Sequence, residues 1–225
     1  RYCDTLGYDS PFSIYDRIIK IAEASKMPIE LHCHNDLGMA VANSISGAKA
    51  AIDAGCDVYI NTTINGIGER SGNADLITVI LAIKYANYFD NENYSFLENV
   101  NLKAAWKTCK YASYAFKVPI PITQPGVGAN AFAHASGIHA DGVIKDRKNY
   151  ELYDYEELGR GEPELIETGR QIVVGEYSGI RGFRNVYDNL AVEFKNEEEA
   201  RKILELTRFA NVEKQKPLVE EELLF

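Results

Sequence analysis

The chain has 225 residues, of which 46% are hydrophobic and 25% are charged, a composition typical of globular proteins that excludes disorder and collagen-like repeats. Lysine and arginine total 24 against 33 acidic residues, so the net charge of −9 argues against a nucleic-acid partner. No run approaches the ~20 apolar residues of a membrane-spanning helix, and no secretion signal opens the sequence. We therefore expect a cytoplasmic protein without a membrane segment.

The cysteines are also typical of the cytoplasm. Cys3, Cys33, Cys56 and Cys109 are scattered without CxxC spacing, which favours reduced thiols over a disulfide framework. We expect all four to be small buried hydrophobic residues.

The first predicted elements are a strand end and a helix. Residues 1–7 are typical of a strand that enters a loop. Ser10 is predicted to cap a helix that begins at Pro11 and ends near Lys26. Its apolar face is predicted to contain Ile14, Ile18 and Ile21.

Two further strand and helix pairs follow. Residues 28–34 predict a strand, and the next helix ends at Gly55. Residues 58–64 predict a third strand, and residues 74–86 a third helix. The apolar face of the second helix is predicted from Val41, Ile45, Ala48 and Ile52. Strict alternation of strand and helix indicates parallel strands joined by helical crossovers.

These three units supply only part of a closed barrel, because an eight-stranded barrel takes roughly 250 residues. We therefore predict that residues 1–90 form part of a larger parallel α/β domain, and that residues 91–225 form a second, mainly helical domain. A helix is predicted over 102–116, and a charged amphipathic helix over 197–209. The apolar face of this last helix is predicted to contain Ala200, Ile203, Leu204 and Leu206.

Two histidines lie at the end of the second strand. His32 and His34 are two residues apart on extended backbone, so both imidazoles point to one face and can converge on one metal ion. The spacing alone is equally compatible with partly buried, hydrogen-bonded histidines. Asn35 and Asp36 could orient the rings, although Asp36 is expected mainly to cap the following helix.

The segment after the third strand is rich in glycine. Residues 65–73 read Asn-Gly-Ile-Gly-Glu-Arg-Ser-Gly-Asn, which lets the backbone approach a ligand closely. Asn73 lies where the next helix begins, so it is either a helix cap or a ligand-binding residue. Glu69 and Arg70 are expected to form a structural ion pair.

Three segments together resemble a known family. Residues 29–42, with Glu-Leu-His-Cys-His-Asn-Asp-Leu-Gly, resemble a signature of the isopropylmalate and homocitrate synthases. Residues 65–73 resemble their NGIGERxGN segment, and residues 135–142 are similar to their SGIHxDG motif. The resemblance is strongest to homocitrate synthases of the nitrogen-fixation type. It implies the sixth to eighth strands of a TIM (β/α)8 barrel, followed by a helical subdomain that reaches the active site of a dimer partner.

The resemblance also implies roles for the barrel residues. His32 and His34 match metal ligands of the family, and Asn73 would lie in or beside the coordination sphere. The metal would be Mg, Mn or Zn, all of which accept histidine and oxygen ligands. Thr5 matches the threonine that holds the carboxylate of the 2-oxo acid. The metal would supply the positive centre that this acidic protein lacks.

In the second domain, His139 matches the histidine that takes part in acid-base chemistry, and Tyr150 the tyrosine that assists it. The alternative for His139 is a packed histidine in a glycine-rich loop. His134 lies outside the motif position, and we expect it to be structural.

The sequence departs from the family in two ways. It has neither the LRDGEQ segment of the first strand nor the general-base glutamate of a middle strand, which leads us to expect a fragment or one subunit of a split synthase. The partner would then be the N-terminal half of the barrel, since uncovered sheet edges favour association. In addition, Glu176 and Tyr177 stand where relatives usually have Lys and His in GKHSG.

The first functional hypothesis is an acyltransferase of the homocitrate synthase type, which condenses acetyl-CoA with 2-oxoglutarate. Within the same chemistry, the alternatives are a citrate synthase of the Re-face type that uses oxaloacetate, an isopropylmalate synthase and a citramalate synthase. Other classes are a metal-dependent lyase that cleaves C–C bonds and a non-catalytic subunit of a split synthase.

Overall fold

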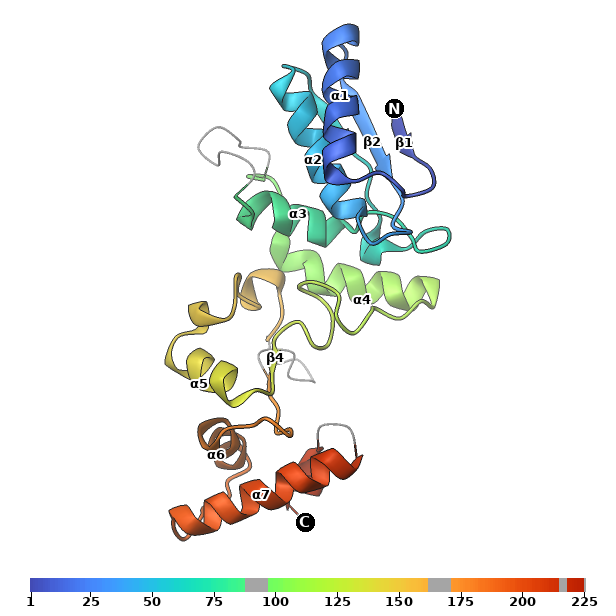
Figure 1. Ribbon diagram of the computed structural model, residues 1–225. Helices are drawn as coiled ribbons and strands as arrows, with labels where there is room; N and C mark the ends of the chain where they lie inside the picture. Colours follow the sequence, from blue (N-terminus) through green and yellow to red (C-terminus); the bar gives the residue numbers. More distant parts are fainter. Residues whose placement is uncertain (88–96, 162–170, 215–217, 225) are drawn as a thin grey trace. The chain divides into compact units, whose positions relative to one another are not determined.

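The computed structural model describes residues 1–87, 97–161, 171–214 and 218–224. These residues form two compact units, 1–128 and 129–225 (Figure 1). The domain boundary predicted between residues 90 and 91 lies outside the described residues. Within the described residues, no helix has the length and apolar character needed to cross a bilayer.

The first unit alternates strands and helices, as predicted. β1, β2 and β3 form a parallel sheet in the order β1-β2-β3, and α1 and α2 pack against each other on one face of it (Figure 1). The elements are β1 Tyr2–Asp4, α1 Pro11–Ser25, β2 Ile29–Cys33, α2 Ala40–Asp53, β3 Val58–Ile60, the 3-10 turn η1 Ile64–Gly66, α3 Leu76–Tyr85, the 3-10 turn η2 Leu102–Ala104 and α4 Ala105–Phe116. This arrangement confirms the predicted α/β class with parallel strands.

The first helix begins where its capping chemistry predicts. The Ser10 hydroxyl accepts a hydrogen bond from the Ser13 amide at 3.2 Å, and the Ser13 hydroxyl accepts one from the Ser10 amide at 2.9 Å. Pro11 occupies the first helical turn. The predicted apolar face is wrong at its last position, because Ile21 is 43% exposed and Ala22 is buried instead.

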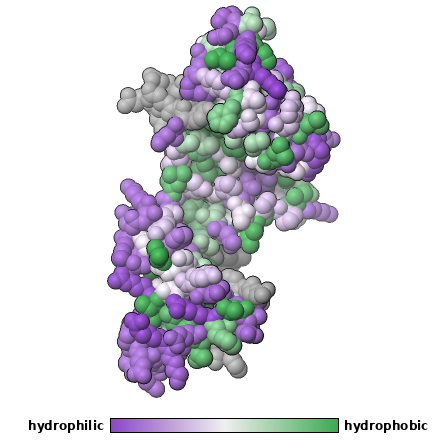
Figure 2. All heavy atoms as spheres, in the orientation of Figure 1, coloured by the Kyte–Doolittle hydropathy of each residue, from purple (hydrophilic) through white to green (hydrophobic). Residues whose placement is uncertain are grey.

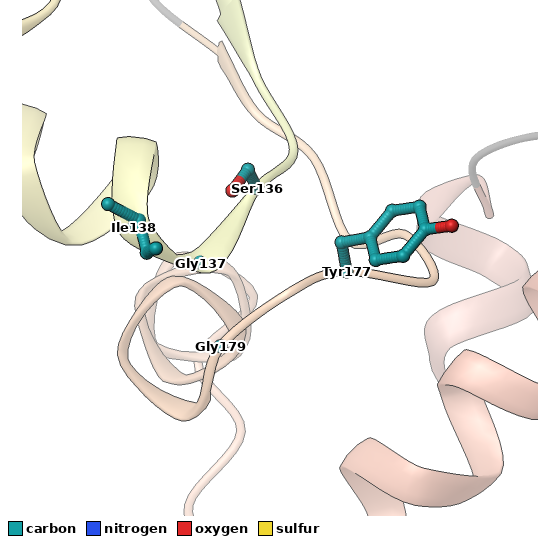
Figure 3. A pocket seen from close by; sticks show the side chains of 5 residues that line it. All are labelled: Ser136, Gly137, Ile138, Tyr177 and Gly179. Atoms are coloured by element: carbon teal, nitrogen blue, oxygen red, sulfur yellow. The ribbon is translucent and has the colours of Figure 1, made fainter.

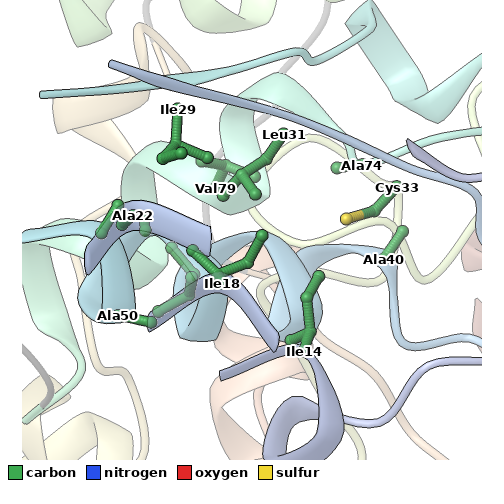
Figure 4. Packing of buried hydrophobic residues seen from close by; sticks show 13 residues of the cluster. Ile14, Ile18, Ala22, Ile29, Leu31, Cys33, Ala40, Ala50, Ala74 and Val79 are labelled. Carbon is green, nitrogen blue, oxygen red and sulfur yellow. The ribbon is translucent and has the colours of Figure 1, made fainter. Parts of the chain in front are cut away.

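The core lies between the sheet and the two helices (Figure 4). Side chains of β2 alternate, so Ile29, Leu31 and Cys33 are buried while Glu30 and His32 are partly exposed. The buried cluster consists of Ile14, Ile18, Ala22, Ile29, Leu31, Cys33, Ala40, Ile45, Ala48, Ala50, Ala51, Ala74 and Val79. Because this face is buried, the register of β2 is fixed, and His32 points to the opposite face of the sheet.

The opposite face of the sheet is polar. Glu30 accepts hydrogen bonds from Arg1 and from Asn61, each at 2.8 Å. Cys3 is the register neighbour of His32 and is exposed, which corrects the expectation that all four thiols are buried. The half-buried Cys56 also departs from that expectation.

The thiols should therefore differ in reactivity. Under native conditions at mildly alkaline pH, we expect iodoacetamide to modify Cys3 well before Cys33 and Cys109, because burial raises the pKa of Cys33 to about 11 and that of Cys109 to about 12. Peptide mass mapping over time measures the order. Modification of Cys33 ahead of Cys3 would contradict the placement of the core.

The same burial predicts a loss of stability at high pH. The unfolded chain releases the Cys33 proton near its ordinary pKa of 9.0, whereas the folded protein keeps it to about 11. Between these values the unfolded state binds fewer protons, so the free energy of unfolding falls as the pH rises.

The second unit is mainly helical. Its elements are β4 Ala133–His134, α5 Gly137–Lys145, the 3-10 turns η3 Arg147–Asn149 and η4 Glu156–Leu158, β5 Gln171–Ile172, α6 Ile180–Asn189, α7 Glu197–Lys214 and α8 Glu220–Leu224. Phe183, Tyr187 and Leu204 belong to its buried cluster. Leu206 is 61% exposed, so its predicted place on the buried face of α7 is wrong. Hydrophilic and hydrophobic side chains are mixed on the visible surface (Figure 2).

Candidate functional site

The loops that follow the three strands meet at the carboxyl edge of the sheet, where parallel barrels place their active sites. The His34 amide donates to the Asp4 carbonyl at 3.3 Å, and the Asn35 amide donates to the Gly72 carbonyl at 2.9 Å. His34 also forms an isolated antiparallel bridge with Asn73. Backbone hydrogen bonds therefore join the three loops in one layer.

The structure brings the predicted metal ligands together. The ring centroids of His32 and His34 are 5.0 Å apart with an interplanar angle of 88°, so one ring meets the other edge to face. His34 is 8% exposed, and His32 is partly exposed. Two imidazoles that approach each other in this way can supply two nitrogen donors to one ion.

Asn73 lies beside this pair. Its amide nitrogen donates to the Cys33 carbonyl at 3.3 Å and lies 3.4 Å from Nδ1 of His34. Asn73 is not the cap of α3, because Asp75 takes that role by accepting a hydrogen bond from the Thr78 amide at 2.8 Å. The amide oxygen of Asn73 packs over Gly68, so it would face the histidines only after the amide rotates.

The donors present fit a divalent ion in their chemistry. Imidazole nitrogen suits Zn, and a carboxamide oxygen suits Mg and Mn. Among the residues that the structure describes, no cluster contains three or more histidine, cysteine, aspartate or glutamate side chains suited to a metal. His32 and His34 are the two imidazoles available at this point, and the Asn73 amide lies against the His34 ring.

The loop that carries Thr5 is shaped by two buried acids. The carboxylate of Asp4, 2% exposed, accepts from the Tyr8 and Asp9 amides at 3.1 and 3.2 Å. Asp9, 1% exposed, accepts from the Tyr2 hydroxyl at 2.5 Å and pairs with Arg17 at 2.9 Å. These contacts hold the turn in place and leave Thr5 exposed. The sequence analysis did not predict this network. Asp4, an acidic residue at the end of a strand, is the local feature that could have indicated it.

Arg70 does not pair as predicted. Its guanidinium binds the Asp36 carboxylate, at 2.8 Å from Nε and 3.0 Å from Nη2, rather than that of Glu69. The hydrogen bonds from Arg70 lower the pKa of Asp36. The expectation that Asp36 caps α2 is therefore wrong, and the Asn35 side chain instead accepts a hydrogen bond from the Ala40 amide at 3.1 Å.

The backbone of the loop after β3 requires glycine at position 72. It has a φ of +86°, and a Cβ added there would lie 2.0 Å from the Gly66 carbonyl oxygen. We expect Gly72→Ala to lower the free energy of unfolding by about 1 to 3 kcal/mol and to weaken metal binding, because the backbone beside Asn73 must shift.

Gly55→Ala is the matched control for this prediction. Gly55 has a similar φ of +74°, but nothing lies within 4 Å of an added Cβ. The Gly55→Ala variant therefore measures only the cost of placing a side chain at a positive φ, without a steric clash. Urea unfolding and metal titration compare the two variants, and equal effects on both measurements would show that the loop has room for the methyl group.

The predicted acid-base residues lie together in the second unit. His139 is on α5, and its ring lies 4.3 Å from that of Tyr150 with an interplanar angle of 33°. Both side chains are exposed. His139 thus lies on a helix, not in a glycine-rich loop as one interpretation of the sequence expected. Gly142 allows close packing, since a Cβ there would be 2.4 Å from Tyr150.

His134 has the structural environment expected for it. Its Nε2 lies 3.1 Å from the Glu151 carboxylate, and the two side chains are 9% and 4% exposed. The His134 and His139 rings are 6.4 Å apart. Because Glu151 follows Tyr150 directly, this buried pair fixes the segment that holds the tyrosine against His139.

Residues 175–179, which correspond to the GKHSG segment of relatives, keep the glycines and the serine that pack in the structure. Gly137 and Gly179 touch backbone to backbone, since a Cβ on Gly137 would lie 2.3 Å from the Gly179 amide nitrogen. The buried Ser178 hydroxyl donates to the Ala135 carbonyl at 2.9 Å. Glu176 and Tyr177 are exposed and contribute through their backbone groups, which explains how the structure accommodates these replacements.

A hollow of about 560 Å³ lies against this contact (Figure 3). It is lined by Ser136, Gly137, Ile138, Tyr177 and Gly179. Ile138 is 74% exposed and Tyr177 is 76% exposed, so the hollow is a shallow surface feature beside α5.

Comparisons with known families match both units. An HMGL-like domain model matches residues 1–110, and a model described as a homocitrate synthase post-HMGL domain matches residues 127–215. The second match begins at residue 127, next to the division between the two units after Gly128.

Curated relatives match the whole chain. It is 63% identical over 226 aligned residues to a citrate (Re)-synthase of Dehalococcoides mccartyi, 37% over 226 to homocitrate synthase 1 of a Nostoc species, and 35% over 225 to 2-isopropylmalate synthase 2 of Caldanaerobacter subterraneus. All of this chain is aligned in each case, against 54%, 54% and 53% of the relatives. The chain thus spans about half the length of these relatives.

Proposed function

Because this chain belongs to the family of the homocitrate and isopropylmalate synthases, we propose that the protein is a metal-dependent acyltransferase that condenses acetyl-CoA with oxaloacetate. Water then hydrolyses the thioester, and the products are citrate and free coenzyme A. The metal is a divalent ion, and acetyl-CoA is a substrate.

The single observation that carries this choice of oxo acid is the identity of 63% to a citrate (Re)-synthase along the entire chain. The homocitrate synthase relative is 37% identical over the same length. The comparison therefore favours oxaloacetate over the 2-oxoglutarate expected from the sequence motifs. Homocitrate synthesis is the second candidate, supported by the match of residues 127–215 to the homocitrate synthase post-HMGL domain.

In the proposed site, His32 and His34 hold the ion, and Asn73 keeps the His34 ring in place through its amide. When bound, a divalent ion polarises the ketone of the oxo acid and neutralises negative charge that develops on its oxygen. The exposed Thr5 hydroxyl donates a hydrogen bond to the carboxylate beside that ketone.

The reaction also requires proton transfers. A C–H bond of the acetyl methyl group breaks, the new C–C bond forms at the ketone carbon, and the resulting alkoxide takes up a proton. In the proposed mechanism, the exposed His139 moves a proton at one of these stages, with the Tyr150 ring packed against its imidazole. In this proposal, His139 acts in the active site of a dimer partner, as the family resemblance implies.

Release of coenzyme A by the protein together with the N-terminal half of the barrel tests the proposal. We expect turnover with acetyl-CoA and oxaloacetate to exceed turnover with 2-oxoglutarate, 2-oxoisovalerate or pyruvate. The citrate formed from labelled acetyl-CoA should show addition to the Re face of the ketone when it is degraded by a citrate lyase of known facial selectivity.

Other results would reject this assignment. Preference for 2-oxoglutarate would establish the homocitrate alternative, and preference for one of the other two oxo acids would indicate an isopropylmalate or citramalate synthase. Cleavage of a hydroxy acyl-CoA without condensation would indicate a lyase. Absence of turnover with every substrate, even when the N-terminal half of the barrel is supplied, would favour a non-catalytic subunit.

A further inference from the structure

Arg70 connects the three loops at the carboxyl edge of the sheet. Besides its two hydrogen bonds to Asp36 in the loop after β2, it donates from Nη2 to the Thr5 carbonyl in the loop after β1 at 2.7 Å. Its own backbone belongs to the loop after β3. One side chain therefore bonds to groups on two other loops that are 34 and 65 residues away in sequence.

The backbone of Arg70 has a strained conformation. Its φ is +56°, which a residue with a side chain rarely adopts and which costs of the order of 1 kcal/mol or more. Such a conformation persists only where the surroundings determine it. Here the guanidinium contacts hold one side of the loop, and the bond of 2.9 Å from the Asn35 amide to the Gly72 carbonyl holds the other.

Each of the three connected loops carries one residue of the proposed site. Thr5 provides the carbonyl that Arg70 binds, His34 lies two residues before Asp36, and Asn73 lies three residues after Arg70. Gly7 reinforces the contact between the first two loops, since a Cβ there would be 2.9 Å from the His34 carbonyl oxygen. The mutual distances of these residues thus depend on the contacts that Arg70 makes.

We infer that Arg70 is a positioning residue, whose guanidinium holds the three loops so that Thr5, His34 and Asn73 face one ligand-binding volume. The consequence for catalysis rests on the proposed function, whereas the arrangement of the loops and of the metal-binding side chains does not. Arg70 acts through its neighbours and is not itself assigned a contact with substrate.

If Arg70 and Asp36 formed only an ordinary surface ion pair, removal of Arg70 would leave metal affinity unchanged. The Arg70 and Asp36 side chains are 41% and 26% exposed, and exposed pairs contribute about 0 to 1 kcal/mol to stability. Removal of Arg70 should therefore change stability little. A residue that orients metal ligands should instead change metal affinity by roughly 10- to 100-fold.

The test compares three variants of the intact protein, and a fourth, Arg70→Ala, serves for chemical rescue. Arg70→Met removes the charge at similar length, and Arg70→Lys keeps the charge without the fork that binds two acceptors. Arg147→Met is the control, because Arg147 forms a comparably exposed ion pair with Asp154, at 48% and 32% exposure, in the second unit. Mn²⁺ affinity is measured by electron paramagnetic resonance, thermal midpoints by calorimetry, and amide exchange in the three loops by mass spectrometry.

We expect Arg70→Met to weaken Mn²⁺ binding by roughly 10- to 100-fold and to raise amide exchange in all three loops, with a thermal midpoint close to that of Arg147→Met. Arg70→Lys should recover only part of the affinity. Ethylguanidinium added to Arg70→Ala should restore some of it, which a purely structural loss would not allow. Unchanged Mn²⁺ affinity and unchanged exchange in Arg70→Met would overturn the inference.

The inference and the proposed function can fail separately. If the unmodified protein turns over no oxo acid but Arg70→Met still weakens Mn²⁺ binding, the proposed reaction is wrong and the positioning role stands. If the unmodified protein makes citrate, and Arg70→Met matches it in Mn²⁺ affinity and in KM for oxaloacetate, the positioning role is wrong and the reaction stands.

Discussion

Replacement of His34 by alanine is expected to strip the divalent ion from the protein and to lower citrate formation by about three orders of magnitude or more. The two imidazoles with centroids 5.0 Å apart are the nitrogen donors of the proposed site, so the variant keeps only one of them. Bound metal supplies several kcal/mol of stabilisation to charge that develops in such reactions, and each 1.4 kcal/mol corresponds to about tenfold in rate. His32→Ala should behave in the same way.

Metal content by elemental analysis after gel filtration, together with the coenzyme A assay, measures both effects. His139→Ala is the matched control, because it removes an imidazole from the second unit and should leave metal content unchanged. His34→Gln separates loss of the ligand from loss of side-chain volume. Full metal retention in both His32→Ala and His34→Ala would show that these histidines have a packing role.

The second large effect is expected at His139. Its replacement by alanine should reduce turnover by about two to four orders of magnitude, the range seen when a positioned acid-base group is removed. The metal content and the fold should persist, because His139 is exposed on α5 and belongs to a different unit from the proposed metal ligands. Tyr150→Phe keeps the ring that stacks at 4.3 Å and removes only the hydroxyl, so it separates packing from proton transfer.

Mixing experiments test whether His139 acts on a partner. In mixed dimers of His139→Ala and His32→Ala protomers, one of the two sites would combine an intact histidine pair with an intact His139, so part of the activity should return. No return of activity after verified subunit exchange would instead place His139 at the site of its own chain or assign it a packing role.

The sequence predicted those features that depend on neighbouring residues. Ser10 and Pro11 carry enough local chemistry to locate the start of α1, and the alternation of β2 placed His32 and His34 on one face. Segments of the family motifs indicated the same side chains. The parallel order of the three strands followed from their alternation with helices.

Contacts between distant residues were harder to predict. Asp36 before a helix resembles a cap, but its partner is Arg70, 34 residues away, and nothing local distinguishes the two roles. Asn73 was ambiguous for the same reason, because Asp75 two residues later meets the capping need of α3. Helical spacing located the faces of α1 and α7 but not their edges, where Ile21 and Leu206 are exposed.

The backbone contact between Gly137 and Gly179 constrains how this protein can change over evolutionary time. A methyl group on Gly137 would lie 2.3 Å from the Gly179 amide nitrogen, and one on Gly179 would lie 3.0 Å from the Gly137 Cα. A larger residue at one position cannot be compensated by a smaller one at the other, because glycine is already the smallest. Random mutagenesis under selection for a folded second unit should therefore return glycine at both positions, while Glu176 and Tyr177 between them drift freely.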